Sequence, residues 1–87
     1  MEQNVPSQVF WHIMFHNIFM VKFSERLKEL RLAKGYSRVQ LAEKLDVNLR
    51  TISYWETGQR QCDFETLIAL VELLDTTADY LLGISDS

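Results

Sequence analysis

The chain has 87 residues, a formal net charge of −3 and 24% charged residues, which is the size and composition of one small globular domain. Its one cysteine, Cys62, cannot form an internal disulfide, and this excludes a disulfide scaffold and fits a reducing compartment. The sequence has no Cys/His cluster with zinc spacing, no glycine-rich phosphate loop and no GxSxG motif, so we expect no enzymatic activity, no metal site and no cofactor.

Charge is distributed unevenly along the chain. Residues 22–60 carry nine basic and five acidic residues, a net charge of +4, whereas residues 61–87 carry six acidic residues and no basic one. Such segregation can give two faces opposite potentials and steer an anionic partner to one of them. Two solvated surfaces without a partner would show the same pattern, so charge alone leaves both interpretations open.

The N-terminal segment is unusually apolar. Residues 1–6 suggest a loose terminus, and residues 9–21, VFWHIMFHNIFMV, contain ten apolar residues of thirteen. This run is shorter than the about 20 residues that span a bilayer, and it lacks the basic flank and cleavage site of a secretory signal. His12 and His16 have the spacing of a helical metal pair, but without a third ligand nearby we favour two partly exposed histidines.

Three explanations of this extension stay open. The translation start can have been placed too early, with the true start at Met14 or Met20. Alternatively, the segment is buried against the domain or against the same segment of a second chain, since an exposed apolar patch of this size promotes association. Attachment to a membrane surface ranks last, because an interfacial helix usually carries a basic polar face. We therefore expect packing or dimerisation and no membrane partner.

Helical spacing and end signals predict five short helices, the first two over about 24–34 and 38–45. In the first, Phe23, Leu27 and Leu30 recur at helical spacing, and Gly35 follows as a left-handed cap. The second is preceded by the capping-box pattern S-R-V-Q at residues 37–40.

The other three helices follow closely. The third covers about 49–57, with Asn48 as N-cap, Ile52 and Trp55 as its buried stripe, and Gly58 at its end. The last two helices are capped by Asp63 and Thr77, and the fifth is closed by a glycine. Their predicted apolar positions are Phe64, Leu67, Leu70, Val71 and Leu74 in the fourth helix and Leu81 and Leu82 in the fifth.

A three-residue link, 46–48, joins the second and third predicted helices, which is helix-turn-helix spacing. Residues 24–83, which include RLKELR, S-x-x-QLAEKL, TIS-x-WE-x-G, ETL and YLLG, resemble the Cro/CI-type helix-turn-helix domain of phage and bacterial repressors, the XRE family. The resemblance covers residues 22–84, so that 1–21 form an apolar N-terminal extension and 85–87 a tail. It implies an all-α, five-helix lambda-repressor-like fold.

The resemblance also implies a function. It predicts a sequence-specific, double-stranded-DNA-binding transcriptional regulator in the cytoplasm, at the nucleoid when bound. We expect a repressor that binds a palindromic operator as a homodimer, with helix 49–57 in the major groove. The alternative is a helix-turn-helix protein-interaction module, antitoxin-like or binding another regulator, with weak DNA affinity of its own.

The resemblance assigns DNA contacts to residues at three places in the domain. Arg50, the only cation of its helix, can donate two hydrogen bonds to guanine, worth about 1–3 kcal/mol of discrimination. Leu49 is expected at a thymine methyl and Tyr54 at a phosphate or base, while the start of the second helix and the loop at 59–61 are expected at phosphates. The DNA-binding candidates are Ser37, Arg38, Asn48, Leu49, Arg50, Thr51, Tyr54, Gln59 and Arg60.

The resemblance further implies an ion pair between Arg31 and Glu56 that ties the first helix to the end of the third. The sequence departs from the family pattern at three positions. Asp46 replaces the usual glycine of the turn, where a positive φ would carry a cost. Arg38 replaces a glutamine, which favours a phosphate contact over base selectivity. Cys62 replaces a proline, and we favour a small buried residue over a redox role.

Overall fold

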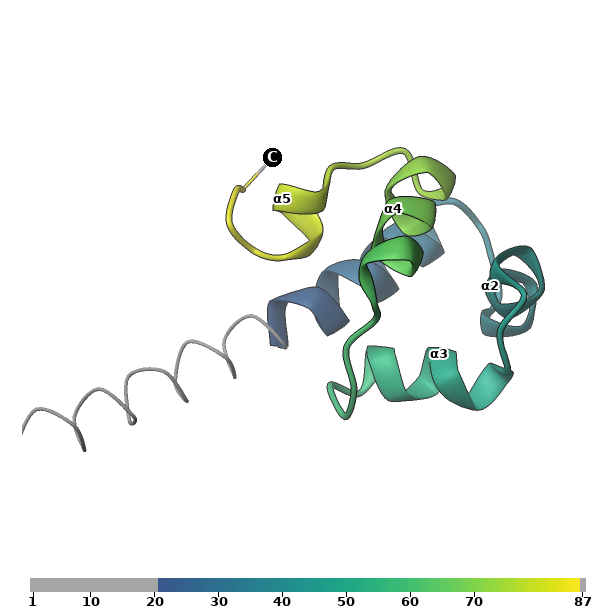
Figure 1. Ribbon diagram of the computed structural model, residues 1–87. Helices are drawn as coiled ribbons and strands as arrows, with labels where there is room; N and C mark the ends of the chain where they lie inside the picture. The colour runs from purple at the N-terminus through teal and green to yellow at the C-terminus, as the bar shows by residue number, and fades with distance from the viewer. Residues whose placement is uncertain (1–20, 87) are drawn as a thin grey trace, which may run out of the picture.

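The computed structural model describes residues 21–86, and the predictions for the extension, including His12 and His16, lie outside this range. A helix covers residues 21–33 and is followed by four more (Figure 1). These are α2 (Arg38–Leu45), α3 (Leu49–Glu56), α4 (Phe64–Leu73) and α5 (Ala78–Leu81). No strand occurs in the described part of the chain, so the predicted all-α, five-helix architecture is confirmed.

Local hydrogen bonds explain why the later helices begin where they do. The side-chain oxygen of each predicted N-cap accepts a hydrogen bond from a backbone N–H of the first turn that would otherwise lack a partner. The capping box also forms, because Ser37 Oγ accepts from the Gln40 N–H at 3.0 Å while Gln40 Oε1 accepts from the Ser37 N–H at 2.8 Å. The four caps are Ser37, Asn48, Asp63 and Thr77.

The cap of α4 makes stability depend on pH. Hydrogen bonds from the side chain and backbone of Thr66 lower the pKa of the Asp63 carboxyl below its ordinary value of 3.8. A carboxyl with a lowered folded-state pKa stabilises the fold fully above its unfolded pKa and loses this contribution as pH falls through the folded pKa.

Asp63→Asn is therefore expected to keep the cap but remove this titration. The difference in thermal midpoint between wild type and variant should be constant above about pH 5 and should change below about pH 4, because only the wild-type carboxylate is lost there. Melting curves between pH 7 and pH 3 measure it. Glu72→Gln, an exposed substitution in the same helix, is the control, and an identical pH response of the two variants would contradict the assignment.

The first helix begins earlier than predicted, since it already includes residue 21. Ser24, which is 7% exposed, lies inside this helix and donates its hydroxyl to the Val21 carbonyl at 2.9 Å. α3 ends at Glu56, one residue early, because Thr57 has left helical geometry with φ −98° and ψ 0°. The glycine at 35 does take the predicted left-handed conformation, with φ 77°.

The core draws on every described helix. The most deeply buried residues come from helices that are far apart in sequence. Leu27 in the first helix and Leu81 in α5, for example, are both 0% exposed. Such burial of aliphatic side chains is the main favourable term in folding. The buried apolar side chains are Phe23, Leu27, Leu41, Ala42, Ile52, Trp55, Leu70, Leu74 and Leu81.

Phe64 contradicts the apolar face predicted for α4. Phe64 is 82% exposed, and Ile68, which lies four residues later on the same side of the helix, is 60% exposed. At about 100° per residue, Phe64 lies about 120° around the helix from the fully buried Leu70. It therefore falls outside the stripe that contacts the core, although its spacing from Leu67 suggested otherwise.

The helix at 21–33 is fastened to the C-terminal end of the domain (Figure 1). Arg26 Nη1 donates to the carbonyl oxygens of Tyr80 at 2.7 Å and Ser85 at 2.6 Å, and its guanidinium lies 4.2 Å from the centre of the Tyr80 ring. The Tyr80 hydroxyl donates to Glu29 at 2.7 Å. These contacts, here called the Arg26 clamp, hold the short α5 against the first helix. Within residues 21–86, no helix has the length and apolar character needed to cross a bilayer.

Candidate nucleic-acid interface

The turn between α2 and α3 sets the direction of α3. Asp46 adopts the left-handed conformation, with φ 56° and ψ 48°, so the position where the family usually has glycine does need a positive φ here. The Val47 N–H then donates to the Ala42 carbonyl at 3.0 Å and closes the end of α2. Asn48, the next residue, is already the N-cap of α3, so the link between the two helices is tight.

α3 has one buried and one outward-facing side. Ile52 is 0% and Trp55 4% exposed, and both belong to the core. On the other side lie Leu49, 45% exposed, and Arg50, whose side chain makes no hydrogen bond or ion pair with any residue between 21 and 86. α3 occupies the lower edge of the domain in Figure 1, with no other described segment beneath it.

The other predicted residues of α3 differ in availability. Thr51 and Tyr54 are half-buried. Asn48 is exposed, and its Oδ1 accepts a hydrogen bond from the Arg50 N–H at 3.0 Å, so the cap already uses one of the two acceptor positions of this oxygen. The structure thus brings Leu49 and Arg50 together as the most accessible pair.

The loop after α3 adds a contact that sequence reasoning missed. The Arg60 guanidinium lies 4.7 Å from the centre of the Tyr54 ring, a cation–π arrangement. The backbone N–H groups of Gln59 and Arg60 both donate to the Tyr54 carbonyl, at 2.9 and 3.3 Å, while Gln59 Nε2 donates to Thr57 Oγ1 at 3.2 Å. The loop cation is therefore held beside the C-terminal half of α3.

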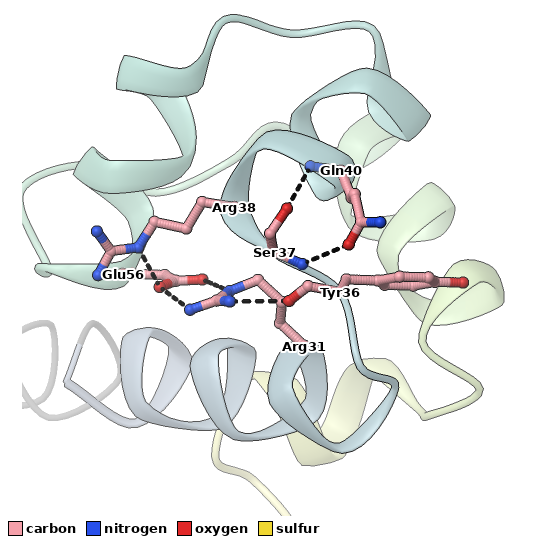
Figure 2. Close-up of polar contacts among 6 residues, drawn as sticks. All are labelled: Arg31, Tyr36, Ser37, Arg38, Gln40 and Glu56. Atoms are coloured by element: carbon pink, nitrogen blue, oxygen red, sulfur yellow. Dashed lines mark hydrogen bonds and ion pairs between the residues drawn. The ribbon is translucent and has the colours of Figure 1, made fainter.

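At the start of α2, an arginine joins a buried ion pair (Figure 2). Glu56 Oε2 accepts from Arg31 Nε at 2.6 Å and Glu56 Oε1 from Arg31 Nη2 at 3.1 Å, a two-pronged pair whose side chains are 6% and 1% exposed. Arg31 Nη1 also donates to the Tyr36 carbonyl at 2.9 Å. Arg38 Nε donates to Glu56 Oε1 at 3.2 Å, a third contact that the family pattern did not suggest because a glutamine is usual there.

Cys62 lies half-buried against the core. Burial raises the pKa of its thiol to about 11, so at neutral pH the group is protonated and a poor nucleophile. Among residues 21–86, His, Cys, Asp and Glu form no group of three able to hold a metal ion.

The order of the helices, the tight turn and the outward α3 are the features by which a helix-turn-helix domain is recognised. The sequence profile of the helix-turn-helix family matches residues 27–81. This chain belongs to that family. The predicted resemblance to its Cro/CI-type, or XRE, branch is confirmed.

Several relatives of this helix-turn-helix chain carry names that describe regulators. The HTH-type transcriptional regulator ImmR of Bacillus subtilis (strain 168) is 38% identical over 63 residues, which cover 72% of this chain and 50% of that protein. The HTH-type transcriptional regulator AnsR of the same strain is 41% identical over 59 residues, covering 68% and 51%. The chain thus spans about half the length of these relatives.

A solved structure shares the fold. The restriction-modification controller protein C.AhdI from Aeromonas hydrophila has a TM-score of 0.65 and 35% sequence identity with this chain. The match covers 71% of this chain and 94% of the controller protein. The described helix-turn-helix domain therefore corresponds to nearly the whole of that controller.

Proposed function

We propose that this domain binds double-stranded DNA in a sequence-specific manner and regulates transcription, with α3 in the major groove. The observation that carries the proposal is the outer side of α3, where the Arg50 side chain is exposed and makes no hydrogen bond or ion pair with residues 21–86. A free guanidinium on a groove-sized helix suits two-pronged contact with guanine. Names of relatives as transcriptional regulators support the same function.

The proposed contacts divide into base and phosphate contacts. On α3, Arg50 would contact a guanine, Leu49 a thymine methyl, and the partly buried Thr51 and Tyr54 the edges of the groove. Asn48 would act mainly through capping α3. Phosphate contacts would come from both sides of α3: Ser37 and Arg38 at the start of α2, and Gln59 and Arg60 in the loop.

Charge distribution is compatible with this orientation. The six acidic residues of the C-terminal third lie in or next to α4, α5 and the following segment, away from α2 and α3 in sequence. With few cations around α3, phosphate neutralisation per copy would be modest. We therefore propose a homodimer on a palindromic operator with half-sites about 10 bp apart, acting as a repressor by occluding a promoter, in the cytoplasm at the nucleoid.

Selection from a random duplex pool tests this function. The full chain is incubated with the pool at low salt, and bound duplexes are amplified and sequenced over several rounds. Enrichment of a two-fold symmetric motif is the expected result, since a dimer would present two copies of α3. Absence of retained duplex at low salt would contradict DNA binding, and an enriched motif without symmetry would contradict the palindromic operator.

Arg50→Ala should remove most base selectivity. The discrimination between the selected motif and a scrambled duplex is expected to fall by about 1–3 kcal/mol, roughly 5- to 150-fold, because one two-pronged guanine contact is lost. Unfolding should be unchanged, since the side chain is exposed. Competition binding measures the ratio of affinities. Lys28→Ala, which removes an exposed cation of the first helix, should leave that ratio unchanged.

A protein-interaction module is the second candidate function. The observation that favours it is the exposed apolar pair Phe64 and Ile68 on α4, 82% and 60% exposed and one helical turn apart. Under this alternative α3 would have little role in DNA retention. Retention of the selected duplex by Arg50→Ala at low salt distinguishes the two functions. If the domain is a protein-interaction module, the substitution would leave this retention unaffected.

A further inference from the structure

We propose that Glu56 is a positioning residue for Arg38, which it holds by Nε so that the two terminal nitrogens face a DNA phosphate. The inference rests on the proposed DNA-binding function and deepens it. It assigns a second role to a carboxylate that the family pattern connects only with Arg31, and it gives a reason for an arginine where glutamine is usual.

Geometry is the first argument. The contact of Arg38 with Glu56 uses Nε alone, at 3.2 Å, and the Arg38 side chain remains 46% exposed. Its terminal nitrogens make no hydrogen bond with any residue that the structure describes. Figure 2 shows these nitrogens pointing away from Glu56 and Arg31. The side chain is therefore oriented at its inner end and open at its outer end.

Charge is the second argument. Arg31 already compensates the Glu56 carboxylate, because both are almost fully buried and joined by two hydrogen bonds. The three side chains together keep a net charge of +1. Arg38 is thus oriented by a carboxylate without losing its attraction for an anion. A lone Glu56 would have cancelled the charge that a phosphate contact needs.

The chemistry of the side chain is the third argument. A guanidinium has donors on two sides, so one edge can bond a carboxylate while the opposite nitrogens bond a phosphate. The three N–H donors of lysine lie on one nitrogen, so in Arg38→Lys a single atom would have to lie within reach of both Glu56 and the phosphate. Glutamine has no charge to offer to the phosphate.

Two substitutions at one position form the test. Arg38→Lys keeps the charge, whereas Arg38→Ala removes it, and both are titrated with the duplex that binds wild type best, across a salt series. Both variants are expected to lose roughly tenfold in affinity at moderate salt, since one charged hydrogen-bonded contact is lost or weakened. In Arg38→Ala the slope of log affinity against log salt should also fall, by about 0.9 for each phosphate released. Wild-type affinity in Arg38→Lys would overturn the positioning role.

A spectroscopic measurement tests the hydrogen bond between Arg38 and Glu56 directly. The Arg38 Nε–H resonance, assigned by its absence in Arg38→Ala, should show the slow exchange of a bonded group in the free protein and keep it when duplex is added. Loss of the bonded signal on adding duplex would overturn the proposal, because Arg38 would then leave Glu56 to bind. Unchanged thermal midpoints in both variants are expected, since Glu56 keeps Arg31; a large drop would instead indicate a merely structural role.

The two levels of inference fail in different ways. If wild type retains no duplex, the proposed function fails. If wild type binds, Arg50→Ala loses selectivity and Arg38→Ala loses affinity, but Arg38→Lys binds as wild type does, then only the positioning role of Glu56 fails.

Discussion

Replacing Glu56 with alanine is expected to lower the free energy of unfolding by about 3–5 kcal/mol, because it would leave the buried Arg31 without its counter-charge. Arg31 is 5% exposed and directs Nε and Nη2 at the carboxylate that would be missing. Urea denaturation at neutral pH measures the loss. Arg31→Ala should lower the free energy of unfolding similarly. At temperatures where this variant stays folded, it should also weaken DNA binding, although Arg31 is not a proposed DNA contact, because the ion pair that joins α3 to the first helix is lost.

An ion pair whose carboxylate is exposed provides the control. Arg26, whose side chain is 16% exposed, lies 3.5 Å from Asp86, whose side chain is 99% exposed. Asp86→Ala should change the free energy of unfolding by less than about 1 kcal/mol, because the carboxylate that it removes is solvated. A loss for Glu56→Ala as small as that for Asp86→Ala would show that the buried pair does not stabilise the fold, and full operator affinity in Arg31→Ala would contradict its role in orienting α3.

Trp55→Ala is expected to cost about 3–5 kcal/mol, the usual range for deleting a large buried ring. Trp55 is 4% exposed and, with Ile52, holds the eight-residue α3 against the core. Loss of this contact should therefore loosen α3 and weaken binding to selected and scrambled duplexes alike. Urea denaturation gives the first effect, and titration of both duplexes at low temperature gives the second.

Phe64→Ala matches this experiment, because it also deletes an aromatic ring but at a position that is 82% exposed. Its effect on the free energy of unfolding should stay within about 0.5 kcal/mol. Equal losses for the two variants would contradict the burial pattern described for α3 and α4.

Features that depend on neighbours in sequence were predictable. The caps at Ser37, Asn48 and Asp63 follow from hydrogen bonds that span two or three residues, so the sequence alone contains both partners. The turn at Asp46 was predicted as a place of possible strain, and its φ of 56° agrees. The predicted start of the first helix at about residue 24 was too late: residue 21 is already helical, and Ser24 bonds back to a carbonyl inside the helix.

Features that depend on distant residues were less predictable. The contact between Arg31 and Glu56 was expected only through the family resemblance, and the contact between Arg38 and Glu56 was missed because it joins residues 18 apart through side chains. The exposure of Phe64 was missed because spacing shows which residues share a side of a helix but not how wide the buried stripe is. The roles of individual residues on DNA stay predictions for the same reason: they depend on a partner outside the chain.

The Arg26 clamp has a consequence for the order in which the domain is made. α5 has four residues, too few to form a stable helix alone. Arg26, which donates to the carbonyls of Tyr80 in α5 and of Ser85 beyond it, lies 54 and 59 residues earlier in the chain. Leu81, wholly buried, reaches the core from this last helix. During synthesis, α2 and α3 would therefore emerge from the ribosome before the core is complete. The domain would fold fully only after α5 has also emerged and Leu81 can pack into the core.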